Sequence, residues 1–279
     1  MILSKRGASL IAPAASIGVF ILLWGIISLN VSAEFLPSPL AVVKEALRLL
    51  HANIGGTSLW GHIGWSLRRV LIAFFLAILL GLPLGLYMGW NRVCEKIVSP
   101  IFEVLRPIPP IAWIPIAILW LGVAEGSKIF ICFVGAFVIM ILNAYTGMRY
   151  VDPLLIDAAK SFGANRTQQF FNVAVPACMP SIFAGVQNAL SMAWMCVLAA
   201  EMVGARQGVG FIIIQGMDLN KPAMILVAWC LSASSAPCSP QRCVRLKSCS
   251  APGAENWCEE NAHATGQSES RRPDPRNQD

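Results

Sequence analysis

The sequence DAAKSFGANRTQQFFNVAVP, residues Asp157–Pro176, belongs to a polar segment (149–176) that is set between two long apolar runs. Helix signals indicate that this segment is ordered, because Asp152 followed by Pro153 is typical of an N-cap and a first helical residue. Gly163 permits a sharp turn. The segment therefore predicts two short helices joined at this glycine.

The first of these short helices has the character of a docking element. Its apolar, partly small side chains gather on one face: Leu154, Leu155, Ala158 and Ala159. Small side chains allow a helix to lie deep in a partner's groove, and Asp157 can pair with an arginine of that partner. Pro176 marks the entry into the next apolar run. An ordinary connection between helices is the competing interpretation of these residues alone.

The composition of the whole chain indicates a membrane protein. Its 279 residues are 56% hydrophobic and 13% charged, with a net charge of +6, whereas a soluble domain carries roughly 25% charged residues. A water-soluble enzyme is therefore not expected. The net charge belongs entirely to residues 1–230 and forms no basic arm, so a nucleic-acid partner is not indicated either.

Long apolar runs predict an all-α, polytopic transmembrane helical bundle with five clear spans and a truncated sixth. A span needs about 20 apolar residues, and helices satisfy their own backbone groups in lipid. We expect the first run to be an uncleaved helix, although Val31–Ala33 could pass for a signal-peptidase site. A sixth run from Pro222 ends near Ala233 and is too short to cross. The five spans are expected at 10–29, 67–90, 100–122, 129–148 and 180–203.

Several residues inside the spans predict local features. Gly81, Gly85 and Gly89 are four residues apart and favour close helix packing in lipid. Pro83 predicts a kink. Four prolines in the run 100–122 prevent one straight helix, which fits either a kinked structural helix or the wall of a pathway. Two further expectations concern the last third of the chain, where Glu201 is a structural or functional carboxylate near a span end and 204–220 is a glycine-punctuated loop.

Motifs of enzyme chemistry are absent from the sequence. There is no G-x-x-x-x-G-K-[ST], H-E-x-x-H, G-x-S-x-G or C-x-x-C, and these are the patterns that bind nucleotide phosphates, zinc or acyl substrates. We therefore predict a protein that is not an enzyme, with no catalytic residue, metal or cofactor.

The spacing of the polar segment resembles the EAA loop of ABC importer permeases. The family pattern is E-A-A, three residues, G, nine residues, I, one residue, L-P. Here Asp157 replaces Glu, and Val173 and Val175 replace Ile and Leu. Residues 10–230 also resemble the nitrate/sulfonate/taurine type of permease in five stretches: FLPSP (35–39), SLRRVLIAF (66–74), GLPLGLYMGW (81–90), LRPIPPIAWIPIAILWLG (105–122) and AAEMVGARQGVG (199–210).

The resemblance implies a MetI-like permease of the bacterial inner (plasma) membrane that imports a small anion such as nitrate, a sulfonate or taurine. It implies cytoplasmic ABC ATPase subunits, a periplasmic solute-binding protein and a second permease copy as partners. Asp157, Ala158, Ala159, Gly163 and Pro176 would then couple the permease to the ATPase. We expect Gln187, Asn188 and Met192 to line the pathway. Basic residues divide almost evenly between the two membrane sides, so charge alone does not assign the orientation.

The last 49 residues, 231–279, depart from that family. This polar tail contains four of five closely spaced cysteines whose spacing matches no zinc pattern. We interpret the tail as disordered sequence from a shifted reading frame, in competition with a cysteine-rich module. Two competing hypotheses concern the whole chain: an inactive permease, or a secondary transporter or channel that needs no ATPase. A secondary transporter would place ionisable groups deep in its spans, where this chain has few.

Overall fold

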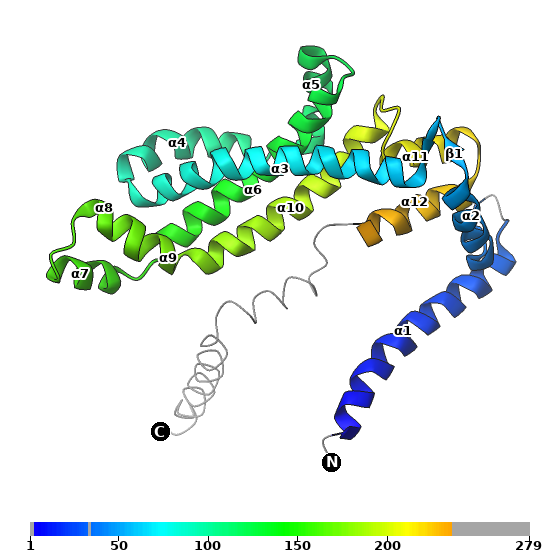
Figure 1. Ribbon diagram of the computed structural model, residues 1–279, viewed down its shortest axis with the longest axis horizontal. Coiled ribbons are helices and arrows are strands. Elements are labelled where there is room, and N and C mark those ends of the chain that lie inside the picture. Colours follow the sequence, from blue (N-terminus) through cyan, green and yellow to red (C-terminus); the bar gives the residue numbers. More distant parts are fainter. Residues whose placement is uncertain (1–2, 33–34, 236–279) are drawn as a thin grey trace, which may run out of the picture. The chain divides into compact units, whose positions relative to one another are not determined.

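A computed structural model describes residues 3–32 and 35–235, with side chains from residue 15 onward. The expected disordered, frame-shifted tail therefore lies outside the described residues from position 236. The described chain is helical except for one short hairpin (Figure 1). In chain order the elements are α1 (Leu3–Asn30), α2 (Pro39–His51), β1 (Asn53–Ile54), β2 (Thr57–Ser58), α3 (Leu59–Trp90), α4 (Arg92–Leu105), η1 (Pro110–Trp113), α5 (Ile114–Leu121), α6 (Glu125–Arg149), α7 (Pro153–Ser161), α8 (Arg166–Gln168), the π-helix η2 (Gln169–Ala174), α9 (Val175–Ala177), α10 (Met179–Met202), α11 (Val209–Asp218) and α12 (Pro222–Ser235).

Three long helices form the centre of the fold. Helix α6 packs along both α3 and α10 (Figure 1). The main core lies between them, and many of its completely buried residues are small: Ala73, Ala77, Ala136, Ala144, Ala189 and Ala193. Small side chains let helix backbones approach closely, which is how helices gain packing energy in lipid.

The glycine stripe of α3 lies against α6, as its spacing predicts. A β-carbon on Gly85 would come within 2.7 Å of the Ile141 carbonyl oxygen, and one on Gly89 within 2.6 Å of the Met148 side chain. A β-carbon on Gly81 would be less crowded, at 3.2 Å from the Phe137 side chain. The close approach of α3 to α6 thus depends on glycine, which has no side chain, at these positions. Helix α3 continues through Pro83.

The predicted all-α transmembrane bundle is confirmed, but the described residues contain fewer than the five expected spans. By length and composition, 3 helices can cross a membrane, namely α3, α6 and α10, or up to 4 spans if one bent pair is counted. The described side chains of α1 cover only Ala15–Asn30, a shorter apolar helix. Helix α12 is described from Pro222 to Ser235, where the described residues end, so the short sixth run stays a prediction.

The bent pair consists of α4 and the segment η1–α5, which meet at 85°. The prolines explain this break: Pro109 precedes the 3₁₀ turn that Pro110 begins, and a proline supplies no backbone N–H to continue a helix. The expectation that 100–122 is not one straight helix is therefore confirmed.

Two element boundaries differ from the sequence-based expectation. Helix α3 begins at Leu59 instead of residue 67, because the Ser58 hydroxyl caps it by accepting from the Gly61 N–H at 3.3 Å. The expected loop 204–220 contains the helix α11. Its apolar residues, among them Ile212, are buried in a second core with α2 and α12, and this tertiary packing outweighs the glycines.

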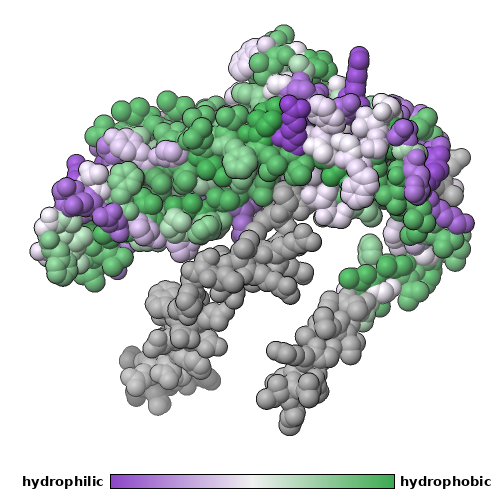
Figure 2. All heavy atoms as spheres, in the orientation of Figure 1, coloured by the Kyte–Doolittle hydropathy of each residue, from purple (hydrophilic) through white to green (hydrophobic). Residues whose placement is uncertain are grey.

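The surface separates into apolar and polar parts. Figure 2 shows a broad hydrophobic area over α3, α4 and α6, with hydrophilic residues gathered near α8 and again near α2 and β1. Large apolar residues of α3 and α4 are strongly exposed, for example Leu79, Ile97 and Val104. Such a contiguous apolar area is typical of a surface that lipid or another subunit covers.

Candidate functional site

Helix α7 begins where the sequence predicts. The Asp152 carboxylate accepts a hydrogen bond from the Leu154 N–H at 2.9 Å, and Pro153 is the first helical residue. An N-cap of this kind stabilises a helix by about 1 kcal/mol. The segment 149–176 is thus ordered from its first turn.

Gly163 ends α7 in a left-handed conformation with φ of 78°. The Gly163 N–H donates to the Lys160 carbonyl at 2.9 Å, and the Ala164 N–H donates to the Ala159 carbonyl at 3.0 Å. This pair of bonds is the Schellman motif. Glycine is the usual residue at this position because, without a β-carbon, it adopts the left-handed conformation easily. A β-carbon here would meet nothing within 4 Å. The backbone angle, not packing, therefore explains the glycine, and the predicted sharp turn is confirmed.

The remaining surface of α7 is open. Leu154 is 72% exposed and Phe162, directly after the helix, is 92% exposed, while Ala158 is exposed as well. Asp157 is paired with Lys160 of its own helix at 2.8 Å, and an exposed pair of this spacing contributes only about 0.2–0.5 kcal/mol. Most of the predicted apolar face is thus exposed in the described chain, and Asp157 can exchange its partner at small cost.

The chain after Gly163 returns to the bundle through unusual helix geometry. Residues Gln169–Ala174 form a π-helix that leads into the short α9, which contains Pro176. Proline supplies no N–H for the regular i to i−4 bond, so a local departure from α geometry is expected there. The buried Gln169 amide donates to the Ala164 carbonyl at 2.7 Å and fixes the turn after Gly163.

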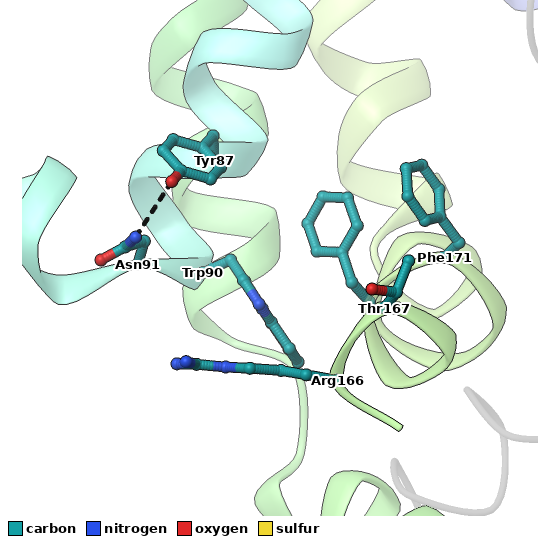
Figure 3. A pocket seen from close by; sticks show the side chains of 7 residues that line it. Tyr87, Trp90, Asn91, Arg166, Thr167 and Phe171 are labelled. Atoms are coloured by element: carbon teal, nitrogen blue, oxygen red, sulfur yellow. Dashed lines mark hydrogen bonds between the residues drawn. The ribbon is translucent and has the colours of Figure 1, made fainter. Parts of the chain in front are cut away.

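Aromatic residues attach this loop to the end of α3. The rings of Trp90 and Phe170 meet edge to face with centroids 5.4 Å apart. Figure 3 shows Trp90 between the end of α3, where the Asn91 amide donates a hydrogen bond to the Tyr87 hydroxyl, and the α8–η2 segment. The Arg166 side chain extends beside Trp90 (Figure 3). The returning part of the loop, after Gly163, is therefore held against α3 through Phe170 and against α10 through α9.

An ion network lies at the other end of the three long helices, with Arg69 and Glu201 buried and the Glu125 side chain 48% exposed. Arg69 of α3 donates through Nη1 to Glu201 of α10 at 2.7 Å, and both side chains are at most 2% exposed. Its Nε and Nη2 donate to the two Glu125 oxygens of α6 at 2.6 and 2.8 Å. A bidentate arginine–carboxylate pair is among the strongest hydrogen-bonded ion pairs. We call Arg69, Glu125 and Glu201 the charge cluster.

The backbone before α11 completes this cluster. The Gly210 N–H donates to Glu201 at 3.0 Å, and the Ser66 hydroxyl donates to the same carboxylate at 2.7 Å. Ser66 in turn accepts from the Val209 N–H at 2.9 Å. The Gly208 N–H donates to Nδ1 of His62 at 3.0 Å, so Nε2 carries the proton toward the Ile54 carbonyl. Every polar group of the cluster thus has a partner.

Sequence reasoning found only Glu201 of this cluster. In the sequence, Arg69 and Glu125 look like ordinary charges at the membrane interface. Arg69 lies 56 positions from Glu125 and 132 positions from Glu201, so no local pattern connects these residues. The expectation that Glu201 is near a span end is correct, and its side chain is completely buried. The one available signal was a doublet of arginines, Arg68 and Arg69, within an otherwise apolar run.

The three residues expected to line a pathway do not share one environment. Asn188 is exposed, Gln187 is half-buried, and Met192 packs on the main core, where a β-carbon on Gly135 of α6 would approach its Cγ at 3.3 Å. All three lie on α10. Their role remains a prediction.

Comparison with known proteins assigns the fold and the family. Residues 77–238 match the family model of the binding-protein-dependent transport system inner membrane component. The fold resembles an inward-facing structure of the MetNI methionine ABC transporter, with a TM-score of 0.53 and 20% identity over 63% of this chain and 92% of that one.

Curated relatives agree with that assignment. The taurine transport system permease protein TauC of Escherichia coli is 34% identical, over 68% of this chain and 70% of TauC. The nitrate import permease protein NrtB of Synechocystis is 33% identical, over 78% and 81%. The aliphatic sulfonates transport permease SsuC of Bacillus subtilis, itself a tentative assignment, is 32% identical, over 76% and 75%.

These relatives are transport components whose ATP hydrolysis belongs to a separate ATPase. The prediction of a membrane transport subunit that is not itself an enzyme is therefore confirmed. The chain belongs to the binding-protein-dependent transport system inner membrane components, the multi-pass permease subunits of ABC importers.

Proposed function

We propose that α7 is the element on which a cytoplasmic ATPase subunit docks, and that residues 149–176 transmit its motion to the bundle. The observation that carries this proposal is the contrast within the loop. Leu154 and Phe162 present unpartnered apolar surface on a capped helix. Gln169 and Phe170, by contrast, hold the return of the loop against the bundle.

This arrangement transmits displacement rather than absorbing it. Helix α7 is closed at both ends by caps, so it moves as one body. Its motion reaches α10 through α9 and reaches α3 through the Trp90–Phe170 contact. In a pair of permease copies, each copy contributes one α7. If the closed ATPase binds these two helices more tightly than the open ATPase does, its closure shifts the pathway between outward and inward access.

We also propose that the solute is a small anion, delivered by a periplasmic binding protein to a pathway between two copies of this chain. The support is the set of relatives named for taurine, nitrate and aliphatic sulfonates. Gln187, Asn188 and Met192 are the proposed lining residues, with Asn188 the most accessible. Competition among taurine, nitrate and an alkyl sulfonate for ATP-dependent uptake into proteoliposomes identifies the solute class. Uptake of none of the three contradicts the proposal.

A matched pair of leucine variants tests the docking role. Leu154→Asp places a charge on the proposed contact face, whereas Leu219→Asp does the same at an exposed leucine after α11. Burying an unpaired carboxylate in an interface costs several kcal/mol, so Leu154→Asp is expected to reduce ATPase association at least tenfold. Equal ATPase association for the two variants contradicts the docking role.

A further inference from the structure

A positively charged cavity of about 590 Å³ lies beside α7. Its walls come from the end of α3, the start of α4, the end of α6 and the loop 149–176. The cavity contains four cationic side chains and one carboxylate, that of Glu95. The cationic side chains are Arg92, Arg149, Lys160 and Arg166.

Two of the four cations are free to bind a ligand. Arg149 is paired with Glu95, and Lys160 is paired with Asp157. Within residues 35–235, Arg92 and Arg166 form neither an ion pair nor a side-chain hydrogen bond, and both are exposed. A cavity of this size that is lined by two unpaired guanidinium groups is suited to phosphate recognition.

A second cavity, of about 380 Å³, adjoins the first and shares Trp90 and Arg166 with it. Its other walls are mostly aromatic and include Phe170. Figure 3 shows Phe171 on one side and Tyr87 on the other. Figure 3 shows Arg166 reaching from the aromatic cavity along Trp90. The cationic cavity is thus continuous with the aromatic cavity.

The pair of cavities opens next to apolar surface. Tyr87, Val93 and Ile97 are each more than half exposed on α3 and α4 at this corner. Aromatic rings with arginines beside an apolar surface are typical of the membrane–water interface. A free phosphate ion uses only the cationic cavity, whereas a phospholipid also uses the aromatic cavity and the apolar surface.

We propose that these two cavities form a binding site for one anionic phospholipid of the cytoplasmic leaflet. Its phosphate lies between Arg92 and Arg166, and its glycerol and first acyl carbons lie against Trp90 and Phe171. Basic pockets between transmembrane helices are suited to such head groups. Because Arg92 belongs to α4 and Arg166 to the loop 149–176, the lipid joins that loop to the bundle. The assignment of the leaflet, but not the binding site, rests on the proposed function.

The test is native mass spectrometry of the full chain released from nanodiscs of equal phosphatidylglycerol and phosphatidylcholine content. We expect the wild type to retain phosphatidylglycerol preferentially. Arg92→Gln/Arg166→Gln is expected to lose about tenfold or more of that preference, since two interfacial charges are removed. The control Arg206→Gln/Lys221→Gln removes two exposed, unpaired charges elsewhere on the described chain and is expected to behave as wild type.

Three outcomes overturn the proposal. Equal retention of both lipids excludes an anionic lipid site. Displacement of phosphatidylglycerol by inorganic phosphate alone, with Phe171→Ala without effect, identifies a free phosphate site. Unchanged lipid retention in Arg92→Gln/Arg166→Gln with reduced ATPase association identifies a contact with an acidic ATPase surface. Because lipid retention is measured without the ATPase, its failure is distinguishable from failure of the docking role.

Discussion

Arg69 and Glu201 meet at 2.7 Å between α3 and α10, and neither side chain is more than 2% exposed. Removing one member of such a pair leaves an uncompensated buried charge, which costs about 3–5 kcal/mol. Arg69→Met is therefore expected to lower the unfolding temperature strongly in detergent. Arg68→Met, a change to the exposed neighbouring arginine, is expected to change it little.

The same pair predicts a rescue. In Arg69→Met/Glu201→Gln no full charge stays unpaired in that contact, because the introduced glutamine is neutral, so part of the lost stability is expected to return. The measurement is the unfolding temperature of the wild type, the two single variants and the double variant in one double-mutant cycle. Strictly additive losses would show that the two residues do not interact as the distance implies.

Two glycines of α3, one in the glycine stripe and one outside it, predict opposite effects of substitution by alanine. Gly85→Ala places a β-carbon 2.7 Å from the Ile141 carbonyl oxygen, and such overpacking costs about 1–3 kcal/mol. Gly64 is in the same helix with nothing within 4 Å of its β-position. Gly64→Ala is expected to stabilise by about 0.5–1 kcal/mol, because alanine is the better helix former. Chemical denaturation of both variants checks the signs.

The turn after α7 depends on the positive φ of Gly163. The stability of variants at this position should therefore depend on how readily the new residue adopts a positive φ. Gly163→Ala is expected to cost about 1–2 kcal/mol locally, whereas Gly163→Asn should cost less, because asparagine visits this region more readily. Hydrogen exchange of the α7 amides measures the effect. Equal protection in the two variants would contradict the role assigned to φ of 78°.

We propose that the sequence beyond about residue 230 comes from a shifted reading frame. The feature that motivates this is the apolar run of the sequence from Pro222, which ends near Ala233. Translation of the other two frames past codon 230 is expected to contain an apolar stretch of about 18 residues, the minimum for a span. Independent resequencing of the gene provides the control. Two frames without such a stretch contradict the interpretation.

Local signals in the sequence predicted the parts of the site that depend on local geometry. Asp152 caps α7 and Gly163 turns the chain because neighbouring backbone groups require it. Gly85 contacts α6 because the four-residue spacing of the stripe defines one helix face. The proline-rich run 100–122 likewise contains the break between α4 and α5.

Tertiary contacts decided the parts that the sequence did not predict. Arg69 and Glu125 are partners only because α3 and α6 place them together. Helix α11 forms despite Gly210 and Gly216 because its apolar residues fill the second core. The cationic cavity combines Arg92 and Arg166, which lie 74 positions apart on separate helices. The periodic pattern of apolar residues in a sequence does not indicate such distant pairs.

The central claim is that α7 docks the ATPase, and one substitution at two glycines tests it most directly. Gly163 and Gly56 both have positive φ and open space at the β-position, so arginine introduces similar strain at each. ATP-driven solute uptake and ATPase association are measured for both variants in proteoliposomes. We predict that Gly163→Arg abolishes association and uptake, while Gly56→Arg, in the β1–β2 hairpin, retains both. Wild-type association and uptake in Gly163→Arg would contradict the account.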